Sequence, residues 1–327
     1  MAYKSKMVGV GYYTPEKVVT NQNLVESLDT SDEWIQKKIG VKERRIIEDK
    51  ETASDLAARA SKMALKNARM QAEEVDLIVL ATNTPDHISP ASAIQVQDKI
   101  NANNAFAFDI RVGGCSGLVY GLSIASKFIA DGSCTNVLVV TTDVNSRGID
   151  WTDRLTAVIM GDGASAVLLR SSTEGGIIDC CLNTDPSGYY DAYIPAGGSA
   201  EPITKISLQN RRQFFKMDGK AIFSFATRVF PESVSKILKD NKLTISDIDF
   251  LISHQANINI IVNSMEKLEM SMDKTYCNIE KYGNTGGSSV GIALGEAIDL
   301  GLIKRGDRIV LVAFGAGLSW GVLLMEY

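Results

Sequence analysis

The sequence predicts a duplicated α/β fold in which two similar halves each contain a buried β-sheet covered by helices. Three observations support this prediction. Short, continuous apolar segments alternate with segments of helical spacing, as in sheets that helices cover on both faces. Two apolar strands recur later in the chain at almost the same offset. Helical segments rich in alanine and leucine, each ending in glycine, lie within both repeats.

The first elements of the N-terminal half are two helices and a buried strand. Thr30-Ser31-Asp32-Glu33 has the form of a capping box and predicts a short helix that stops at Gly40. Thr52 predicts the cap of a second helix. The continuous apolar run from Val75 to Ala81 then predicts a strand buried on both faces.

The next elements continue the alternation. Ser89-Pro90 predicts the start of a helix, and Ala105 to Ile110 predicts a strand. Leu118 to Ile129 has helical spacing up to Gly132, and Asn136 to Thr142 predicts another buried strand.

The internal repeat is visible in two pairs of strands. Val75 to Leu80 matches Ile248 to Ser253 at an offset of 173 residues, and Val137 to Val140 matches Ile309 to Val312 at an offset of 172 residues. Two distant pairs at nearly one offset indicate a duplication. We expect an N-terminal half over residues 1–173 and a C-terminal half over residues 174–327. Equivalent loops of the two halves can then form one cleft.

The composition excludes several classes of function. The 327 residues are 45% hydrophobic and 22% charged, as in a globular protein. The net charge of -5 argues against nucleic acid and against a membrane surface as partners. The N-terminus lacks the apolar run of a signal peptide, so we expect a cytoplasmic protein. The five cysteines are odd in number and form no C-x-x-C pair, which disfavours disulfide and zinc frameworks.

Cys115 lies in the glycine-rich segment Gly113-Gly114-Cys115-Ser116-Gly117, directly before a predicted helix. The positive end of a helix dipole favours a thiolate. Neighbouring glycines permit a sharp turn and the close approach of a substrate. On local sequence alone, two interpretations stay open: a nucleophile, or a small buried hydrophobic side chain.

Three further positions offer polar groups beside the ends of predicted elements. The chain has two histidines, and His254 ends a buried strand, whereas His87 belongs to a loop. A satisfied buried histidine is the alternative interpretation of His254. Asn284 lies in a glycine-rich loop that does not fit the phosphate-binding pattern G-x-x-x-x-G-K-[ST]. Ala316, between two glycines, follows a buried strand and offers backbone N–H groups that can bind an oxyanion.

With these motifs in this order, the chain resembles the β-ketoacyl-acyl carrier protein (ACP) synthases III, the initiating condensing enzymes of the thiolase superfamily. The resemblance implies a thiolase-like fold layered α-β-α-β-α. It covers almost the whole chain and rests on Thr30 to Ile35, Gly113 to Gly117, Thr152-Asp153-Arg154, Gly161 to Ala164, His254-Gln255-Ala256-Asn257, Tyr282 to Thr285 and Phe314 to Gly321.

The resemblance implies a role for each polar position. Cys115 takes an acyl group from acyl-CoA, and His254 and Asn284 drive decarboxylation of malonyl-ACP. The resulting carbanion attacks the acyl group and gives a 3-oxoacyl-ACP, while the backbone N–H groups of Cys115 and Ala316 bind the oxyanion. No metal or redox cofactor is implied.

The resemblance also implies substrate contacts and an assembly. Trp34 and Arg154 match positions that hold the adenine of coenzyme A, and Gly219 and Asn257 match the lining of the pantetheine tunnel. A homodimer is expected, for which the strand from Asn136 to Thr142 is a candidate pairing edge.

Three departures from the family pattern affect these expectations. Asn259 and Ser224 stand where basic residues often help to dock ACP, which puts the strength of docking in doubt. Ser89 stands where a bulky aromatic residue often closes the acyl pocket. A primer longer than acetyl is therefore expected to fit.

Three other functions remain as alternatives. A specialised condensing enzyme of secondary metabolism, of polyketide or quinolone type, is favoured by Ser224 and Asn259. A hydrolase with Cys115 in a nucleophile elbow is disfavoured by the duplication and because strands follow His254. A non-catalytic acyl-CoA-binding protein would not need Cys115, His254 and Asn284 together.

Overall fold

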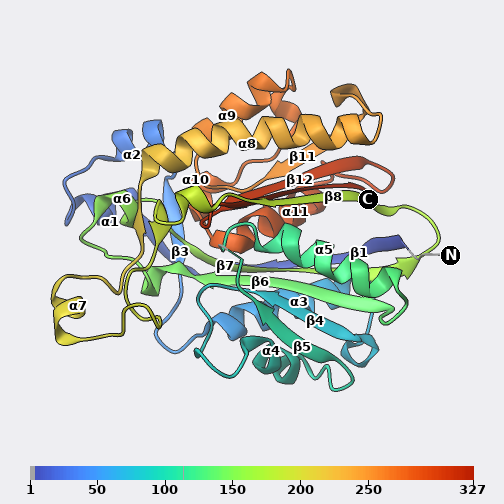
Figure 1. Cartoon of the computed structure of the whole chain (residues 1–327), viewed down its shortest axis with the longest axis horizontal. Helices are drawn as coiled ribbons and strands as arrows, with labels where there is room; N and C mark the ends of the chain where they lie inside the picture. The colour runs from blue at the N-terminus through green and yellow to red at the C-terminus, as the bar shows by residue number, and fades with distance from the viewer. Residues whose placement is uncertain (1–3, 113) are drawn as a thin grey trace.

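Two β-sheets are stacked with helices between them and on both outer sides, so that the layers run α-β-α-β-α (Figure 1). The computed structural model describes residues 4–112 and 114–327. Gly113 of the predicted nucleophile segment lies outside the described residues. The predicted layered architecture is confirmed.

The N-terminal sheet has the strand order β1-β7-β6-β4-β5. Strand β4 is parallel to β5 and β6, whereas β7 is antiparallel to β6 and β1. All five residues of β4 are buried, as its continuous apolar sequence predicts. The strands are β1 (Lys4–Tyr13), β4 (Leu77–Ala81), β5 (Phe106–Ile110), β6 (Asn136–Val144) and β7 (Asp162–Ser172).

The C-terminal sheet repeats this arrangement with the order β8-β13-β12-β11. Strand β11 is parallel to β12, as β4 is to β6, and the pairs β12–β13 and β13–β8 are antiparallel. Leu77 pairs with Val137, and Phe250 pairs with Ile309, so the repeat read from the sequence is also a repeat of register. The strands are β8 (Gly176–Thr184), β11 (Phe250–Ser253), β12 (Arg308–Gly315) and β13 (Ser319–Glu326).

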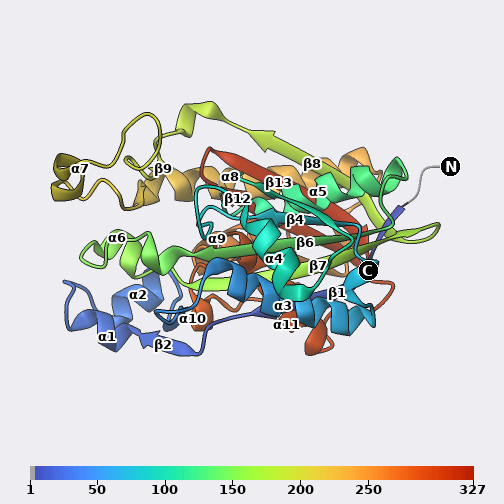
Figure 2. The ribbon, with the colours of Figure 1, turned by 90° about the horizontal axis from the view of Figure 1, so that it is seen from below.

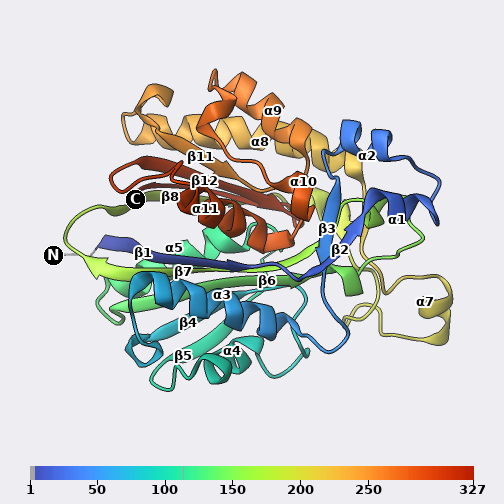
Figure 3. The same cartoon turned by 180° about the vertical axis from the view of Figure 1, so that it is seen from behind.

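Six helices form the three helical layers. Helices α5 and α11 lie between the sheets, where their apolar side chains form one core with the inner sheet faces (Figure 3). Glycines let them approach the strands closely: a Cβ at Gly291 would lie 2.0 Å from Ser165 Oγ. The other four cover the outer faces, with α3 and α4 on the N-terminal sheet and α8 and α9 on the C-terminal sheet. Their bounds are α3 (Ala53–Ala68), α4 (Ser92–Ile100), α5 (Gly117–Ala130), α8 (Gly219–Asp240), α9 (Ile258–Lys267) and α11 (Ser289–Asp299).

Two predicted helix starts are displaced in the structure. Helix α2 (Asp32–Lys38) is capped by Ser31, whose Oγ accepts the Trp34 N–H at 3.1 Å. The predicted capping box, which begins at Thr30, is therefore wrong by one residue. Helix α4 begins at Ser92 rather than at Ser89-Pro90. The carboxylate of Asp109 in β5 accepts its first N–H groups, those of Ser92 and Ala93, at 2.8 and 2.7 Å. A cap from a distant strand thus sets this start.

Several short elements lie toward the end of the molecule that also holds α2 and α6, the helices that contain Trp34 and Arg154 (Figure 2). They are β2 (Lys17–Thr20), α1 (Asn21–Val25), β3 (Glu43–Ile46), α6 (Arg154–Ala157), β9 (Ala192–Tyr193), α7 (Lys205–Gln209), β10 (Lys216–Met217) and α10 (Ile279–Tyr282). The 3-10 helices are η1 (Ala72–Glu74), η2 (Asn145–Arg147), η3 (Pro186–Gly188), η4 (Ile245–Asp247), η5 (Met272–Lys274) and η6 (Gly286–Ser288).

Strand β6 is enclosed by β4 on one side and β7 on the other. The expectation that Asn136 to Thr142 pairs across a two-fold axis is therefore wrong, because both of its hydrogen-bonding edges are occupied. The boundary that we propose between residues 173 and 174 lies between β7 and β8.

Candidate active site

Three residues singled out by the sequence lie at the ends of elements in the centre of the fold. Cys115 precedes α5, His254 follows β11, and Asn284 precedes η6 and α11. Asn284 and His254 are buried, and Cys115 is partly exposed. The first half thus supplies the thiol, and the second half supplies the imidazole and the amide.

The side chain of Asn284 lies close enough to Cys115 to lower the pKa of its thiol. Its Oδ1 accepts the Gly286 N–H at 2.9 Å, so the Nδ2 hydrogens are the part of the amide that is free to face the thiol. The loops behind these residues are also in contact, since a Cβ at Gly287 would lie 2.7 Å from Gly114 O. The structure therefore brings the predicted nucleophile and the predicted amide together.

The surroundings of Cys115 disfavour the thiolate form of its side chain. Burial and the nearby charge of Asp143 raise the pKa of the thiol to about 12, although a backbone hydrogen bond and Asn284 lower it. Loss of hydration therefore opposes the thiolate that the helix terminus is expected to favour, and the reactivity of Cys115 stays a prediction.

Asp143, at the end of β6, is a buried residue that the sequence reasoning missed. Its carboxylate accepts the N–H groups of Asn83 and Gly287 at 3.0 and 2.8 Å, but burial still raises its pKa to about 6. Its position directly after a buried parallel strand was a usable signal, because polar residues at such ends often belong to sites.

His254 contacts the first residue of α11, the helix that follows the Asn284 loop. Its Nδ1 lies 2.6 Å from Ser289 Oγ, and the ring of Phe314 stands edge-on to the imidazole with centroids 5.2 Å apart. Burial lowers the pKa of the imidazole to about 3, so the ring is neutral at physiological pH. A neutral imidazole offers one donor and one acceptor.

The turn that contains Ala316 is tied to the nucleophile loop by two serines. Ser319 Oγ lies 2.8 Å from Ser116 Oγ and donates to Ala316 O at 2.9 Å. Ser116 immediately follows Cys115, and its Oγ also lies 3.1 Å from Val112 O. These contacts fix the two backbone segments whose N–H groups the sequence assigns to an oxyanion.

Trp34 and Arg154 lie against each other at the end of the molecule. The Cζ of Arg154 is 5.2 Å from the centroid of the Trp34 ring, and its Nη1 donates to Asp29 O at 2.8 Å. Gly219 begins α8 in open surroundings, where an added Cβ would meet only Met217 Cε at 3.9 Å.

Asn257 and Asn259 attach α9 to the end of α2. Their Nδ2 groups donate to Lys38 O at 3.0 and 2.9 Å, and Asn257 Oδ1 accepts the Asn259 N–H at 2.9 Å. The Asn257 amide is thus engaged within the protein. Asn259, in place of a basic residue, has the same anchoring contact, and Ser224 is exposed on α8.

Ser89 is exposed on the loop before α4, and the neighbouring Ile88 is 89% exposed. The described contacts do not bring Ser89 to Cys115 within the chain. Its assignment to the acyl pocket therefore stays a prediction.

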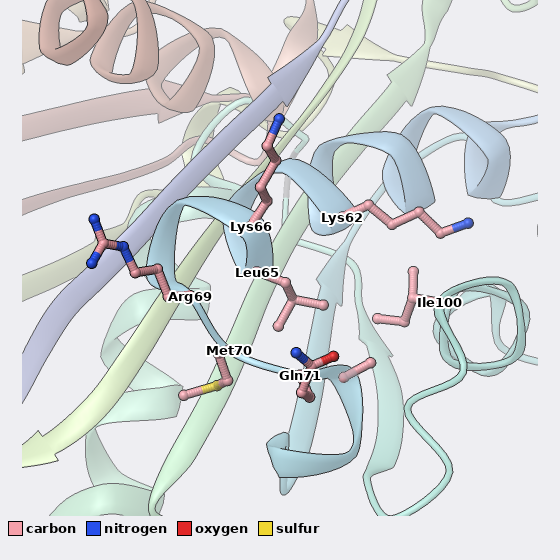
Figure 4. A pocket seen from close by; sticks show the side chains of 8 residues that line it. Lys62, Leu65, Lys66, Arg69, Met70, Gln71 and Ile100 are labelled. Atoms are coloured by element: carbon pink, nitrogen blue, oxygen red, sulfur yellow. The ribbon is translucent and has the colours of Figure 1, made fainter.

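A basic hollow on α3 is separate from this cluster (Figure 4). Lys62, Lys66 and Arg69 surround it, and α3 covers the outer face of the N-terminal sheet, whereas Cys115 precedes a helix on the inner face. Across residues 4–112 and 114–327, no cluster of three metal-ligating side chains occurs. No helix in that same part of the chain is both long and apolar enough to cross a membrane.

Known family models match segments of both halves of the chain. Residues 108–186 match the family described as 3-oxoacyl-[acyl-carrier-protein (ACP)] synthase III, and residues 238–327 match its C-terminal family. The chain is 43% identical to the beta-ketoacyl-[acyl-carrier-protein] synthase III of Clostridium acetobutylicum over 98% of both chains.

Solved structures show the same similarity. The 3-oxoacyl-[acyl-carrier-protein] synthase III of Aquifex aeolicus superposes with a TM-score of 0.91 at 38% identity, over 99% of this chain and 100% of that one. The priming β-ketosynthase of the R1128 polyketide pathway superposes with a TM-score of 0.92 at 30% identity, over 99% and 97%.

Proposed function

Because the chain belongs to the β-ketoacyl-ACP synthase III family, we propose that Cys115, His254 and Asn284 together perform its condensation. The protein is an acyltransferase that initiates fatty acid synthesis by decarboxylative condensation of an acyl group with a malonyl thioester. The contact between the Cys115 loop and the Asn284 loop, where a Cβ at Gly287 would lie 2.7 Å from Gly114 O, supports this assignment most strongly, because it brings the two halves together at these residues.

In the first step, the sulfur of Cys115 attacks the carbonyl carbon of acyl-CoA. The new carbon–sulfur bond replaces the bond to coenzyme A, and the thiol proton ends on the coenzyme A sulfur. One thioester replaces another, so the transfer is reversible. Because the pKa of the thiol is raised to about 12, deprotonation accompanies the attack rather than preceding it.

In the second step, malonyl-ACP loses CO2 and leaves an enolate. The electron pair of the broken carbon–carbon bond moves onto the thioester, where the oxygen becomes negative. The imidazole of His254 and the amide of Asn284 supply hydrogen bonds to that oxygen. Both groups are buried and neutral, so they act in a low dielectric without a counter-charge.

In the third step, the enolate carbon attacks the acyl carbonyl on Cys115. The tetrahedral oxygen then receives the N–H groups of Cys115 and Ala316, whose segments Ser116 and Ser319 hold together. Collapse breaks the carbon–sulfur bond, releases 3-oxoacyl-ACP and leaves the Cys115 sulfur as a thiolate, which takes a proton from solvent. The three reaction steps involve no net oxidation or reduction, so we propose that no redox cofactor takes part.

We propose that the adenine of coenzyme A enters between Trp34 and Arg154. A flat ring needs about 3.5 Å on each side, or about 7 Å in all. The present separation is 5.2 Å, so the two side chains must part by roughly 2 Å. Gly219 and Asn257 then border the pantetheine arm.

We also propose how the protein assembles and where in the cell it acts. Strand β5 is one of the two edge strands of the N-terminal sheet, and its Phe106 is 49% exposed, so we propose that a homodimer pairs there rather than through β6. We place the protein in the cytoplasm, because a nucleophilic thiol must stay reduced.

A second candidate is a priming condensing enzyme of secondary metabolism. The similarity to the R1128 priming enzyme supports it, as do the uncharged Ser224 and Asn259. One assay separates the candidates: the protein is mixed with a panel of acyl-CoAs and with either malonyl-ACP or malonyl-CoA. Release of CO2 with a 3-oxoacyl-ACP is expected. Free fatty acid without a condensed product would instead indicate a hydrolase.

A further inference from the structure

His254 is held on three sides. Its backbone N–H donates to Val312 O at 2.8 Å, the Phe314 ring stands edge-on to the imidazole, and Nδ1 lies 2.6 Å from Ser289 Oγ. Within residues 4–112 and 114–327, we find no hydrogen-bond partner for Nε2. The imidazole therefore has one nitrogen committed to the protein and one available to a substrate.

The proton on the imidazole can be located by counting donors and acceptors around Ser289. Its Oγ already accepts the N–H of Gln255 at 3.3 Å. If Nδ1 of His254 also donated, the hydroxyl proton of Ser289 would need another acceptor, and the described residues supply none. If Ser289 donates to Nδ1, every one of these buried groups is satisfied.

We propose that Ser289 is a positioning residue that donates to His254 Nδ1 and so keeps the imidazole proton on Nε2. The hydrogen bond made by one ring nitrogen sets the state of the other. His254 then presents an N–H to the substrate and has no free lone pair. It stabilises the enolate oxygen and does not remove the thiol proton of Cys115. The part of this inference that concerns the enolate rests on the proposed function, whereas the tautomer does not.

Nitrogen NMR of the whole protein labelled with [15N]histidine tests the tautomer directly. The sequence contains only His87 and His254, so two imidazoles are observed. His87 is exposed, and His87→Gln assigns its signals by removing them. For His254 we expect a protonated Nε2 and an unprotonated Nδ1 between pH 6 and 8, with loss of this single tautomer in Ser289→Ala. A proton on Nδ1 in the wild type would overturn the inference.

A kinetic comparison tests the consequence. Ser289→Ala is expected to slow malonyl-ACP decarboxylation tenfold to a hundredfold while Cys115 is still acylated at close to the wild-type rate. Ser165→Ala is the matched control, because it also removes a buried hydroxyl, bonded to Thr141 at 2.7 Å, beside α11.

The two variants should therefore differ in decarboxylation and agree in acylation. Equal decarboxylation rates, with the Nε2–H tautomer retained in Ser289→Ala, would overturn the role of Ser289. Failure of the proposed function has a different signature, in which the wild type shows the Nε2 proton but neither decarboxylates nor condenses.

Discussion

The buried carboxylate of Asp143 accepts a hydrogen bond from the Gly287 N–H at 2.8 Å, which connects strand β6 of one half with the Asn284 loop of the other. The same carboxylate accepts the N–H of Asn83 at 3.0 Å, and its charge raises the pKa of the Cys115 thiol. Gly287 in turn packs against Gly114. Asp143 thus influences both the position and the reactivity of the nucleophile loop.

Asp143→Asn should make Cys115 more reactive. Removing the negative charge lowers the pKa of the thiol, so more thiolate is present at a given pH. We expect faster alkylation by iodoacetamide at pH 8, and in the wild type a rate that keeps rising up to pH 10. A plateau below pH 8 in the wild type, or equal rates in the two proteins, would contradict this account.

The same variant should change the pH dependence of stability. The pKa of Asp143 is raised to about 6 in the folded protein, above its ordinary value of 3.8. Its contribution to the free energy of unfolding is therefore most favourable at low pH and is lost as the pH rises through about 6. Urea denaturation at pH 5 and pH 7.5 measures this effect. The free energy of unfolding of the wild type should lose this contribution at pH 7.5, whereas that of Asp143→Asn should not.

His254→Ala and Asn284→Ala should separate the two half-reactions. Both proteins keep the thiol, so they should still take an acyl group from acyl-CoA. Each loses one donor to the enolate, which typically slows such a step about a hundredfold or more. Decarboxylation of malonyl-ACP, followed as CO2 release, measures the loss. Condensation at the wild-type rate by either variant would remove that residue from the mechanism.

Lys267→Met should destabilise the layer formed by α8 and α9. Pro231 lies within α8 and has no N–H for Thr227 O, and Lys267 Nζ donates to that carbonyl at 2.9 Å. We expect a loss of about 1 kcal/mol in the free energy of unfolding. Lys236→Met is the control, because Lys236 forms an exposed pair with Asp240 that solvent screens, so we expect a much smaller loss. Equal losses would argue against the carbonyl contact.

Ser89→Phe tests the length of the primer. If Ser89 replaces a pocket-closing aromatic residue, several additional methylene groups fit in the native pocket. Four of them favour a medium chain by about 3 kcal/mol, or on the order of a hundredfold. Acylation by acetyl-CoA and octanoyl-CoA measures this preference. A native preference for acetyl-CoA that Ser89→Phe leaves unchanged would contradict the enlarged pocket.

The sequence predicted those features that depend on local pattern. The continuous apolar strands β4 and β11 identified the repeat, because a strand buried on both faces has few alternatives. Cys115, His254 and Asn284 were recognised by their places beside strand and helix ends.

Features that depend on distant contacts were not predictable in this way. The start of α4 is set by Asp109 in β5, and Asp143 meets a residue 144 positions away. The helix that starts after Cys115 is expected to favour a thiolate, whereas burial by the surrounding fold raises the pKa of the thiol. The enclosure of β6 also follows only from the order of the strands.

The most direct test of the account is intact-protein and peptide mass spectrometry after incubation with acyl-CoA alone. We predict one acyl group per chain, located on Cys115, and none on Cys115→Ala. Hydroxylamine should remove the group, as expected for a thioester. Two results would contradict the central claim that Cys115 holds the acyl intermediate. One is an acyl group on another residue, and the other is a wild-type protein that, like the mutant, stays unmodified with every acyl-CoA.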